Sequence, residues 1–281
     1  MKKEISELLA FIKDKNCLLA ITGAGCSTDS GISDYRDSRG LWKKPPPIQY
    51  QDFLRSENAR KRYWLRSQLG YPSFRDASPN KAHQSLVRLE SFGIVHGLIT
   101  QNVDRLHQKA GHREVIDLHG RLDEVVCLEC NKVSSRNEVQ VWLESENPFV
   151  NHLDFELRPD GDASVEAQDL SAFVVPKCFD CDGMIKPNVV FFGGSVPKQT
   201  AEDCQKLVAG CDGLLIVGTS LMAFSAYRLV RFAYQHGLQI ASLNQGTTRA
   251  DEMISCNIVE NCSVALTNLV EVYERSIKSD G

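Results

Sequence analysis

The sequence predicts an α/β protein built on a Rossmann-like, doubly wound parallel sheet. Apolar runs of strand length alternate with stretches of helical length along most of its 281 residues, and strands that alternate with helices in this way form parallel sheets. Glycines or polar residues follow several of these runs, at the sheet edge where open α/β sheets bind ligands. Two stretches interrupt the pattern, a helical insertion over 41–79 and a zinc-binding module over 121–187. The sheet domain would comprise residues 1–40, 80–120 and 188–281.

Composition limits the possible classes of protein. With 42% hydrophobic residues the chain can bury a large core. Its net charge of -4 argues against general nucleic-acid binding. No apolar run approaches the roughly 20 residues of a membrane span, and residues 1–16 have the mixed charge of an amphipathic helix, unlike a signal peptide. We therefore expect a cytoplasmic protein without nucleic-acid or membrane partners, although a processed organellar protein would have the same composition.

The first strand is predicted by the apolar run from Cys17 to Thr22, which ends in a glycine turn. The missing side chains would let backbone N–H groups approach a phosphate, although a tight turn also needs glycine without any ligand. The residues after the turn add hydroxyl, carboxylate and guanidinium groups that a plain connection would not need. The candidate nucleotide-binding residues are Gly23, Ala24, Gly25, Ser27, Asp34, Tyr35 and Arg36.

Polar side chains also follow the next predicted strand, over 94–100. Gln101, Asn102 and Asp104 come directly after it. Their amides and carboxylate offer donors and acceptors that suit hydroxyls and a carboxamide. A cap on the following helix would explain Asn102 or Asp104 alone, but not all three residues.

A short strand over 115–118 ends at His119, at the same predicted sheet edge as Gly23 and Asn102. Histidine titrates near neutrality, as a general base should, although a lone histidine is more often structural. The other apolar runs predict buried strands, and the amphipathic stretches predict helices. These strands are expected over 189–192, 213–217 and 239–243, and the helices over 80–92, 198–208 and 223–235.

Ten cysteines in a chain without a secretory signal indicate metal ligands or reduced thiols. Two Cys-x-x-Cys pairs can give four thiolates to one tetrahedral zinc ion, which leaves no open position and makes the zinc structural. The separation of the pairs is longer than usual, so the acidic stretch between them is expected to be an insertion. The predicted zinc ligands are Cys127, Cys130, Cys178 and Cys181.

Residues 23–37, GAGCSTDSGISDYRD, resemble the signature of the sirtuins, which are NAD-dependent protein-lysine deacylases. Ser33 stands where the family usually has proline, a change that removes no ligand-contacting group. Three more segments resemble sirtuin motifs, TQNVD at 100–104, DLHG at 117–120 and VVFFG at 189–193. The resemblance covers nearly the whole chain.

The resemblance implies a role for each segment. His119 would be the catalytic base, and the residues of the TQNVD segment would contact the nicotinamide ribose and carboxamide. An acyl-lysine peptide would pair with the backbone of Val190, Phe191, Phe192 and Gly193, although Gly194 replaces the acidic residue common there and puts the peptide preference in doubt. The contacts implied on the adenosine side of NAD are Gly218, Thr219, Ser220, Asn244, Gln245, Gly246 and Cys262.

The implied reaction transfers the acyl group from lysine to ADP-ribose and releases nicotinamide. Protein ADP-ribosylation would use the same cofactor site, and a non-catalytic adaptor that binds NAD and zinc would not need His119. An NAD(H) oxidoreductase fits poorly. Thr28 occupies the sixth position of G-x-G-x-x-G, and no strand ending in Asp or Glu follows about 20 residues later.

Tyr63 and Arg66 lie three residues apart in the helical insertion, so both can face one carboxylate. This spacing resembles the Tyr-x-x-Arg pair with which some sirtuins hold acidic acyl-lysines. The surrounding sequence resembles the class II branch, to which mitochondrial sirtuins with lipoamidase and ADP-ribosyltransferase activities belong. We therefore expect a preference for acidic or long acyl groups. An exposed Arg66 beside a packed Tyr63 is the structural alternative.

Overall fold

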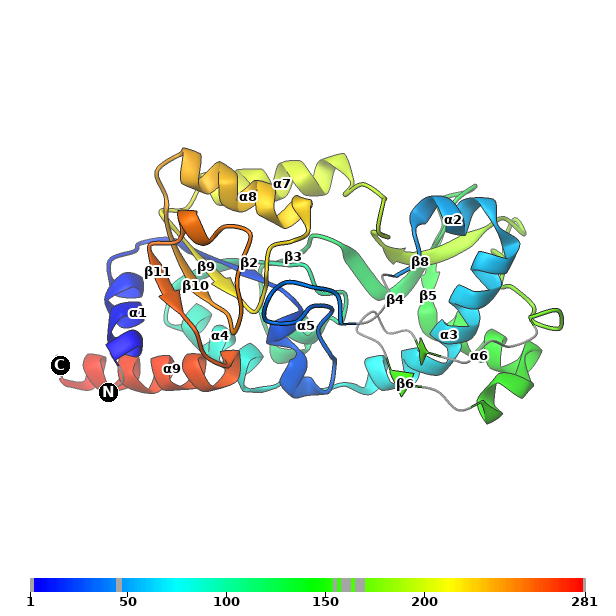
Figure 1. Ribbon diagram of the computed structural model, residues 1–281, viewed down its shortest axis with the longest axis horizontal. Helices are drawn as coiled ribbons and strands as arrows, with labels where there is room; N and C mark the ends of the chain where they lie inside the picture. The colour runs from blue at the N-terminus through cyan, green and yellow to red at the C-terminus, as the bar shows by residue number, and fades with distance from the viewer. Residues whose placement is uncertain (1–2, 44–46, 154–155, 158–162, 165–169, 280–281) are drawn as a thin grey trace.

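The computed structural model describes residues 3–43, 47–153, 156–157, 163–164 and 170–279, which form a large and a small lobe (Figure 1). Both chain termini lie at the end of the large lobe that is farther from the small one. Short 3-10 helices occur in both lobes. They are η1 (Ala24–Cys26), η2 (Thr28–Ser30), η3 (Pro148–His152) and η4 (Asp251–Met253).

The large lobe is a six-stranded parallel sheet with the strand order β11-β10-β9-β1-β2-β3. Its strands are β1 (Leu18–Thr22), β2 (Val95–Thr100), β3 (Val115–Asp117), β9 (Gly213–Val217), β10 (Gln239–Leu243) and β11 (Cys256–Ile258). Successive side chains of a strand point to opposite faces. Leu18 and Ala20 accordingly pack into one hydrophobic core, and Leu19 and Ile21 into another.

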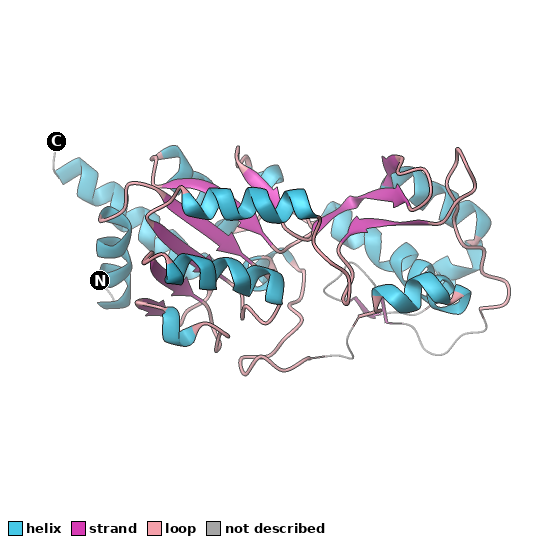
Figure 2. Ribbon diagram, turned by 90° about the horizontal axis from the view of Figure 1, so that it is seen from above, coloured by secondary structure: helices cyan, strands magenta, loops and turns pink. Residues whose placement is uncertain are grey.

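Helices cover both faces of this sheet (Figure 2). One core is closed by α1 (Lys3–Lys13), α4 (Lys81–Ser91) and α9 (Cys262–Ser279), and the other by α7 (Lys198–Ala209) and α8 (Phe224–Gln235). The short helix α5 (Leu106–Ala110) follows β2. The predicted doubly wound α/β fold is therefore confirmed.

The small lobe combines the two predicted insertions. Its antiparallel sheet has the order β5-β4-β8, and its helices share one hydrophobic core with that sheet. Phe53 and Trp64 of the first insertion pack in this core with Val139 and Leu143 of the second. Its elements are α2 (Tyr50–Arg55), α3 (Glu57–Asp76), α6 (Arg136–Glu146), β4 (Gly120–Cys127), β5 (Val133–Ser135), β6 (Glu156–Leu157), β7 (Ala163–Ser164) and β8 (Ile185–Val189). The exact domain boundaries stay a prediction.

Two expectations differ from the structure. The strand expected over 189–192 in the parallel sheet is wrong, because β8 ends at Val189 and pairs with β4 in the small antiparallel sheet. An apolar run does not say which sheet a segment joins, and within this run Phe191 is buried whereas Phe192 is exposed. The acidic stretch between the cysteine pairs contains the unpredicted helix α6, whose Val139 and Leu143 lie one turn apart and face the core.

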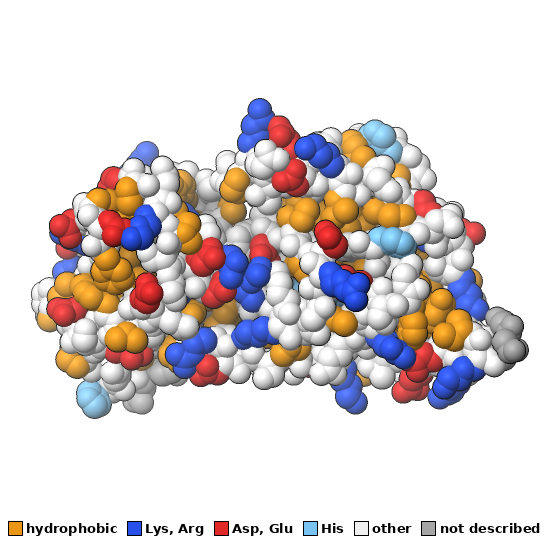
Figure 3. All heavy atoms as spheres, turned by 180° about the vertical axis from the view of Figure 1, so that it is seen from behind, with side chains coloured by type: hydrophobic (Ala, Val, Ile, Leu, Met, Phe, Trp, Pro, Cys, Tyr) orange, Lys and Arg blue, Asp and Glu red, His pale blue; other side chains and the backbone are white. Residues whose placement is uncertain are grey.

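Two surface properties bear on the expected partners. Within the described residues, no helix combines the length and apolar character that crossing a membrane requires. On the face shown in Figure 3, basic and acidic side chains are interspersed and form no extended area of one sign. The expected location and the expected lack of nucleic-acid binding stay predictions.

Three histidines lie buried beside the loop that follows β1. The rings of His83 and His107 have centroids 4.7 Å apart, and that of His112 lies 5.4 Å from His107. Burial lowers the pKa of all three, that of His83 to about 4, while Glu90 partly opposes the shift at His112. The folded protein therefore keeps these imidazoles neutral at a pH where an unfolded chain would protonate them.

Acid should destabilise the protein for this reason. Stability is complete above about pH 6.5 and falls below it, by at most about 1.4 kcal/mol per pH unit for each such histidine. We expect His112→Asn to lose less stability than the wild type between about pH 7.5 and about pH 5, measured as urea midpoints. The matched control is His96→Asn, at an exposed histidine of β2. Equal losses in all three proteins would contradict this explanation.

Candidate active site

A cavity of about 1030 Å³ is lined by the loops that follow β1, β2, β9 and β10 and by residues of the small lobe. Parallel topology brings these strand ends to one edge of the sheet, so residues far apart in the sequence meet there. Among the described residues, the predicted site residues Gly23 and Arg66 do not line the cavity. Those that do are Ala24, Gly25, Ser27, Asp34, Tyr35, Arg36, Tyr63, Gln101, Asn102, Asp104, His119, Val190, Phe191, Phe192, Gly193, Gly218, Thr219, Ser220, Asn244, Gln245, Gly246 and Cys262.

The glycine turn packs against the loop after β9. Gly23 N–H donates to Val217 O at 3.0 Å and Gly25 N–H to Gly218 O at 2.8 Å. A Cβ on Gly25 would lie 2.9 Å from the Gly218 oxygen, and Gly218 has a left-handed φ of +61°. These two N–H groups are thus used within the protein, contrary to the expectation that they face a phosphate. The glycines allow the two loops to approach.

Ser27, Asn102 and Asp104 form one buried hydrogen-bonded group beneath this turn. Ser27 donates to Asp104 Oδ2 at 2.7 Å, and Asn102 Nδ2 donates to Ser27 Oγ and to Gly23 O, both at 3.0 Å. Asp104 also accepts from Leu106 N–H, the first of α5, at 2.9 Å, so it holds the start of this helix as well as lining the cavity. Burial raises its pKa, although these hydrogen bonds oppose the shift. The group fixes the turn against the loop after β2.

His119 is held at the cavity wall by two hydrogen bonds. Its Nδ1 lies 3.1 Å from Gln101 O, and its Nε2 lies 2.7 Å from Ser225 Oγ. A carbonyl oxygen can only accept, so Nδ1 carries the proton in the neutral ring and Nε2 accepts from Ser225. Burial lowers the pKa of His119, with the bond to Gln101 acting in the opposite direction. Nε2 is therefore an unprotonated base near neutral pH.

Sequence reasoning missed Ser225. It lies in the first turn of α8, lines the cavity and contacts a histidine 106 positions away. The one sequence feature that could have indicated Ser225 is its position just after a loop at the sheet edge. Many serines without a functional role have such a position. Gln101 itself is held by Thr219, to whose Oγ1 its Nε2 donates at 3.0 Å.

The segment expected to pair with a peptide runs along the lobe boundary. Val190 N–H donates to His119 O at 2.8 Å, and Tyr50 N–H donates to Phe192 O at 2.8 Å. Gln51 Nε2 donates to Gly193 O at 3.0 Å. The segment is thus anchored both to His119 and to α2.

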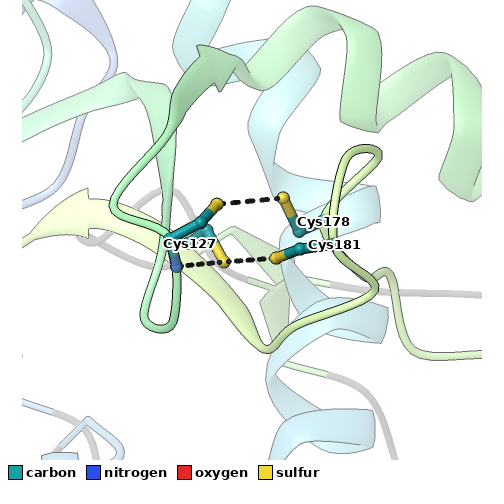
Figure 4. Close-up of side chains that lie close together, drawn as sticks. Cys127, Cys178 and Cys181 are labelled. Atoms are coloured by element: carbon teal, nitrogen blue, oxygen red, sulfur yellow. Dashed lines mark hydrogen bonds between the residues drawn. The ribbon is translucent and has the colours of Figure 1, made fainter.

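The four predicted cysteines come together away from the cavity, at one end of the small antiparallel sheet. Their sulfur atoms all lie within 4.8 Å of one another, with Cys127 and Cys181 at 3.6 Å and Cys130 and Cys178 at 3.7 Å. Cys127, Cys178 and Cys181 point toward a common centre in Figure 4. A tetrahedral zinc ion with bonds of about 2.3 Å would hold its sulfurs about 3.8 Å apart, so these residues fit zinc.

Backbone N–H groups also favour the thiolate form there. Those of Cys130 and Glu129 donate to Cys127 Sγ at 3.5 and 3.4 Å, and they lower the pKa of this thiol to about 7. A zinc ligand must be a thiolate. The donor set therefore matches a structural zinc site in both geometry and chemistry.

Serine at Cys127 should remove the zinc and destabilise the small lobe, because structural metal binding is coupled to folding. Metal analysis should find one zinc ion per chain in the wild type and little in Cys127→Ser, which should also unfold at a lower temperature. Cys256→Ser, at a half-buried cysteine outside the cluster, is the control and should keep its zinc. Freshly prepared, active wild type without zinc would contradict the assignment.

Comparison with known proteins agrees with these features. Residues 23–225 match the Sir2 family. The chain is 48% identical to an NAD-dependent protein deacetylase of Bordetella bronchiseptica, an alignment that covers 95% of this chain and 97% of that protein. It is 44% identical to the NAD-dependent protein deacylase SIR4 of Monosiga brevicollis, covering 90% and 83%.

Solved structures give the same result. One described as "Sir2-p53 peptide-NAD+" superposes with a TM-score of 0.80 at 28% identity, covering 98% of this chain and 99% of that one. A second, "Structure of Sir2Tm bound to a propionylated peptide", gives 0.78 at 26% identity, covering 98% and 99%. The chain therefore belongs to the Sir2 family, the sirtuins, and is an NAD-dependent protein deacylase.

Proposed function

We propose that the chemistry takes place in the cavity between the two lobes, with His119 as the general base. The observation that carries this proposal is the pair of hydrogen bonds on its imidazole, which leave an unprotonated Nε2 facing the cavity. NAD supplies the ribose hydroxyl that receives the acyl group and the nicotinamide that leaves. His119 Nε2 would accept the proton of that hydroxyl, in the position that the Ser225 hydroxyl now occupies.

The lining of the cavity is suited to such a dinucleotide. The amides of Gln101, Asn102 and Asn244 and the hydroxyl of Thr219 offer neutral donors and acceptors for ribose hydroxyls and a carboxamide. Arg36 adds a cation, held by Gly40 O at 2.7 Å and stacked 4.1 Å from the Trp42 ring. We assign the predicted NAD contacts to these residues as part of the proposal.

The segment Val190–Gly193 is proposed to hold the substrate backbone. Its hydrogen bonds to His119 O and Tyr50 N–H fix its position relative to the base, and the side chains of Phe191 and Phe192 pack with aromatic rings of both lobes. A strand-like segment held in this way can add an extended peptide by backbone pairing.

We also propose that the acyl group lies beside Tyr63, in an apolar part of the cavity. Tyr63 is 6% exposed and packs edge-on against Phe53 and Trp64. Apolar residues of both lobes line the same cavity, namely Ile32, Ile48, Phe74, Leu122 and Val189. Since Arg66 is not among the described lining residues, this surface favours a long uncharged acyl chain over an acidic one. Lipoamidase activity is proposed on the same basis, and class II membership on the sequence resemblance around Tyr63 and Arg66.

Replacing His119 should abolish deacylation without unfolding the protein. The loss of a general base typically costs ~10²–10⁴-fold in rate, so His119→Ala should turn over an acetylated peptide at least about a hundredfold more slowly while still binding NAD. Mass spectrometry should show free lysine and O-acyl-ADP-ribose in the wild type. The exposed His236→Ala is the control. Near wild-type turnover by His119→Ala, or ADP-ribosylated protein as the main product, would contradict the proposal.

The acyl preference can be measured as kcat/KM for peptides of one sequence that carry acetyl-, octanoyl- or glutaryl-lysine. We expect octanoyl-lysine to have a higher kcat/KM than glutaryl-lysine, and Arg66→Met to leave the ratio of glutaryl to acetyl unchanged. A charge-assisted contact is worth ~1.5–3 kcal/mol, or roughly a ten- to hundredfold preference. If Arg66→Met lowers the ratio by about tenfold or more, Arg66 binds the acyl carboxylate and the apolar assignment is wrong.

A further inference from the structure

Ser225 and His119 form a pair that the deacylation reaction does not require. The Ser225 hydroxyl donates to His119 Nε2 at 2.7 Å, and His119 Nδ1–H donates to Gln101 O at 3.1 Å. A nucleophile, a base and a group that orients the base are thus linked by two successive hydrogen bonds. This is the geometry by which serine hydrolases activate a hydroxyl, and it recurs on unrelated folds.

The surroundings of Ser225 supply the other parts of such a site. Ser225 and His119 line the same cavity as the apolar residues beside Tyr63, so an acyl group has access to the hydroxyl. Ser225 lies in the first turn of the 12-residue helix α8. The first backbone hydrogen bond of this helix runs from Tyr227 N–H to Ala223 O, so the N–H groups of Ser225 and Ala226 precede it. Such N–H groups can donate to an oxyanion that forms beside them.

We propose that the protein has a second, NAD-independent activity, the hydrolysis of carboxylic esters through an acyl-enzyme on Ser225. Ser225 Oγ attacks the ester carbonyl carbon and its proton passes to His119 Nε2. The ester C–O bond then breaks, and the leaving alcohol takes that proton. Water next attacks the acyl-serine with His119 as base, which releases the carboxylic acid and restores the Ser225 hydroxyl. No oxidant, reductant or cofactor is consumed.

The same geometry limits the substrate class. The group that orients His119 is the neutral carbonyl of Gln101, whereas hydrolases that cleave amides usually use a carboxylate there. A neutral carbonyl stabilises the imidazolium less, so the pair is suited to substrates with good leaving groups. Esters of phenols meet this condition, and the amide of acyl-lysine does not.

The test uses p-nitrophenyl acetate with the full chain and no NAD. Wild type should release p-nitrophenolate and carry an acetyl group on the peptide that contains Ser225, detected by mass spectrometry after an acid quench. Ser225→Ala should release p-nitrophenolate at least tenfold more slowly and carry no such group. Ser225→Cys should accumulate the acetyl group at position 225 as a thioester. Ser195→Ala, at another serine lining the cavity, is the matched control and should match the wild type.

The proposal requires two results, slower release of p-nitrophenolate by Ser225→Ala and an acetyl group at position 225. The proposal is overturned if release by Ser225→Ala stays within twofold of the wild type. It is also overturned if neither wild type nor Ser225→Cys is acetylated at position 225, even where release is reduced. Should Ser225→Ala fail to fold, His119→Ala takes its place, and it should lose both the adduct and the release. Deacylation of an acetylated peptide with NAD, measured on the same wild-type sample, tests the proposed function separately.

Discussion

The close approach of two loops, those after β1 and β9, determines the geometry of the cavity. Gly25 N–H donates to Gly218 O at 2.8 Å, and neither glycine could carry a side chain without a shift of the backbone. Side chains from the loop after β2 bridge the two loops, Asn102 to Gly23 O and Gln101 to Thr219. The carbonyl oxygen of Gln101 in turn orients the imidazole of His119. The position of the His119 imidazole is therefore linked, through Gln101 and Thr219, to the contact between the two glycines.

The central part of the large sheet could be predicted closely from the sequence because β1 and β9 are fully buried and β2 and β10 nearly so. Gly213–Val217 and Gln239–Leu243 match the expected ranges to the residue, since an apolar run bounded by polar or glycine residues marks both ends of such a strand. The short strand Cys256–Ile258 has too few residues to give a pattern. The segment 189–192 was expected in the wrong sheet, because an apolar run has the same composition in a parallel and in an antiparallel sheet.

The site could be predicted where topology alone brings residues together. Residues that follow parallel strands meet at one edge, which explains why the predicted residues after β1, β2, β3, β9 and β10 line one cavity. Ser225 could not be found in this way, because its contact with His119 depends on the position of a whole helix. Helix spacing also could not decide between Tyr63 and Arg66. Both lie on α3, three residues apart, and of the two it is Tyr63 that lines the cavity, where its ring packs against Phe191.

The zinc cluster lies away from the cavity, yet the same two strands connect the two sites. β4 starts at Gly120, directly after His119, and ends at Cys127, a predicted zinc ligand. β8 begins four residues after Cys181 and ends at Val189, and the next N–H group, that of Val190, donates to His119 O. β4 and β8 pair regularly from Val125 to Cys127 and again at Gly120, with an irregularity between these points, so a zinc ion that joins Cys127 to Cys181 would hold the regular end of the pair. The Gly120–Val189 pair lies at the other end, next to His119 and Val190, so the zinc site supports the strands from which the proposed base and the proposed peptide segment extend.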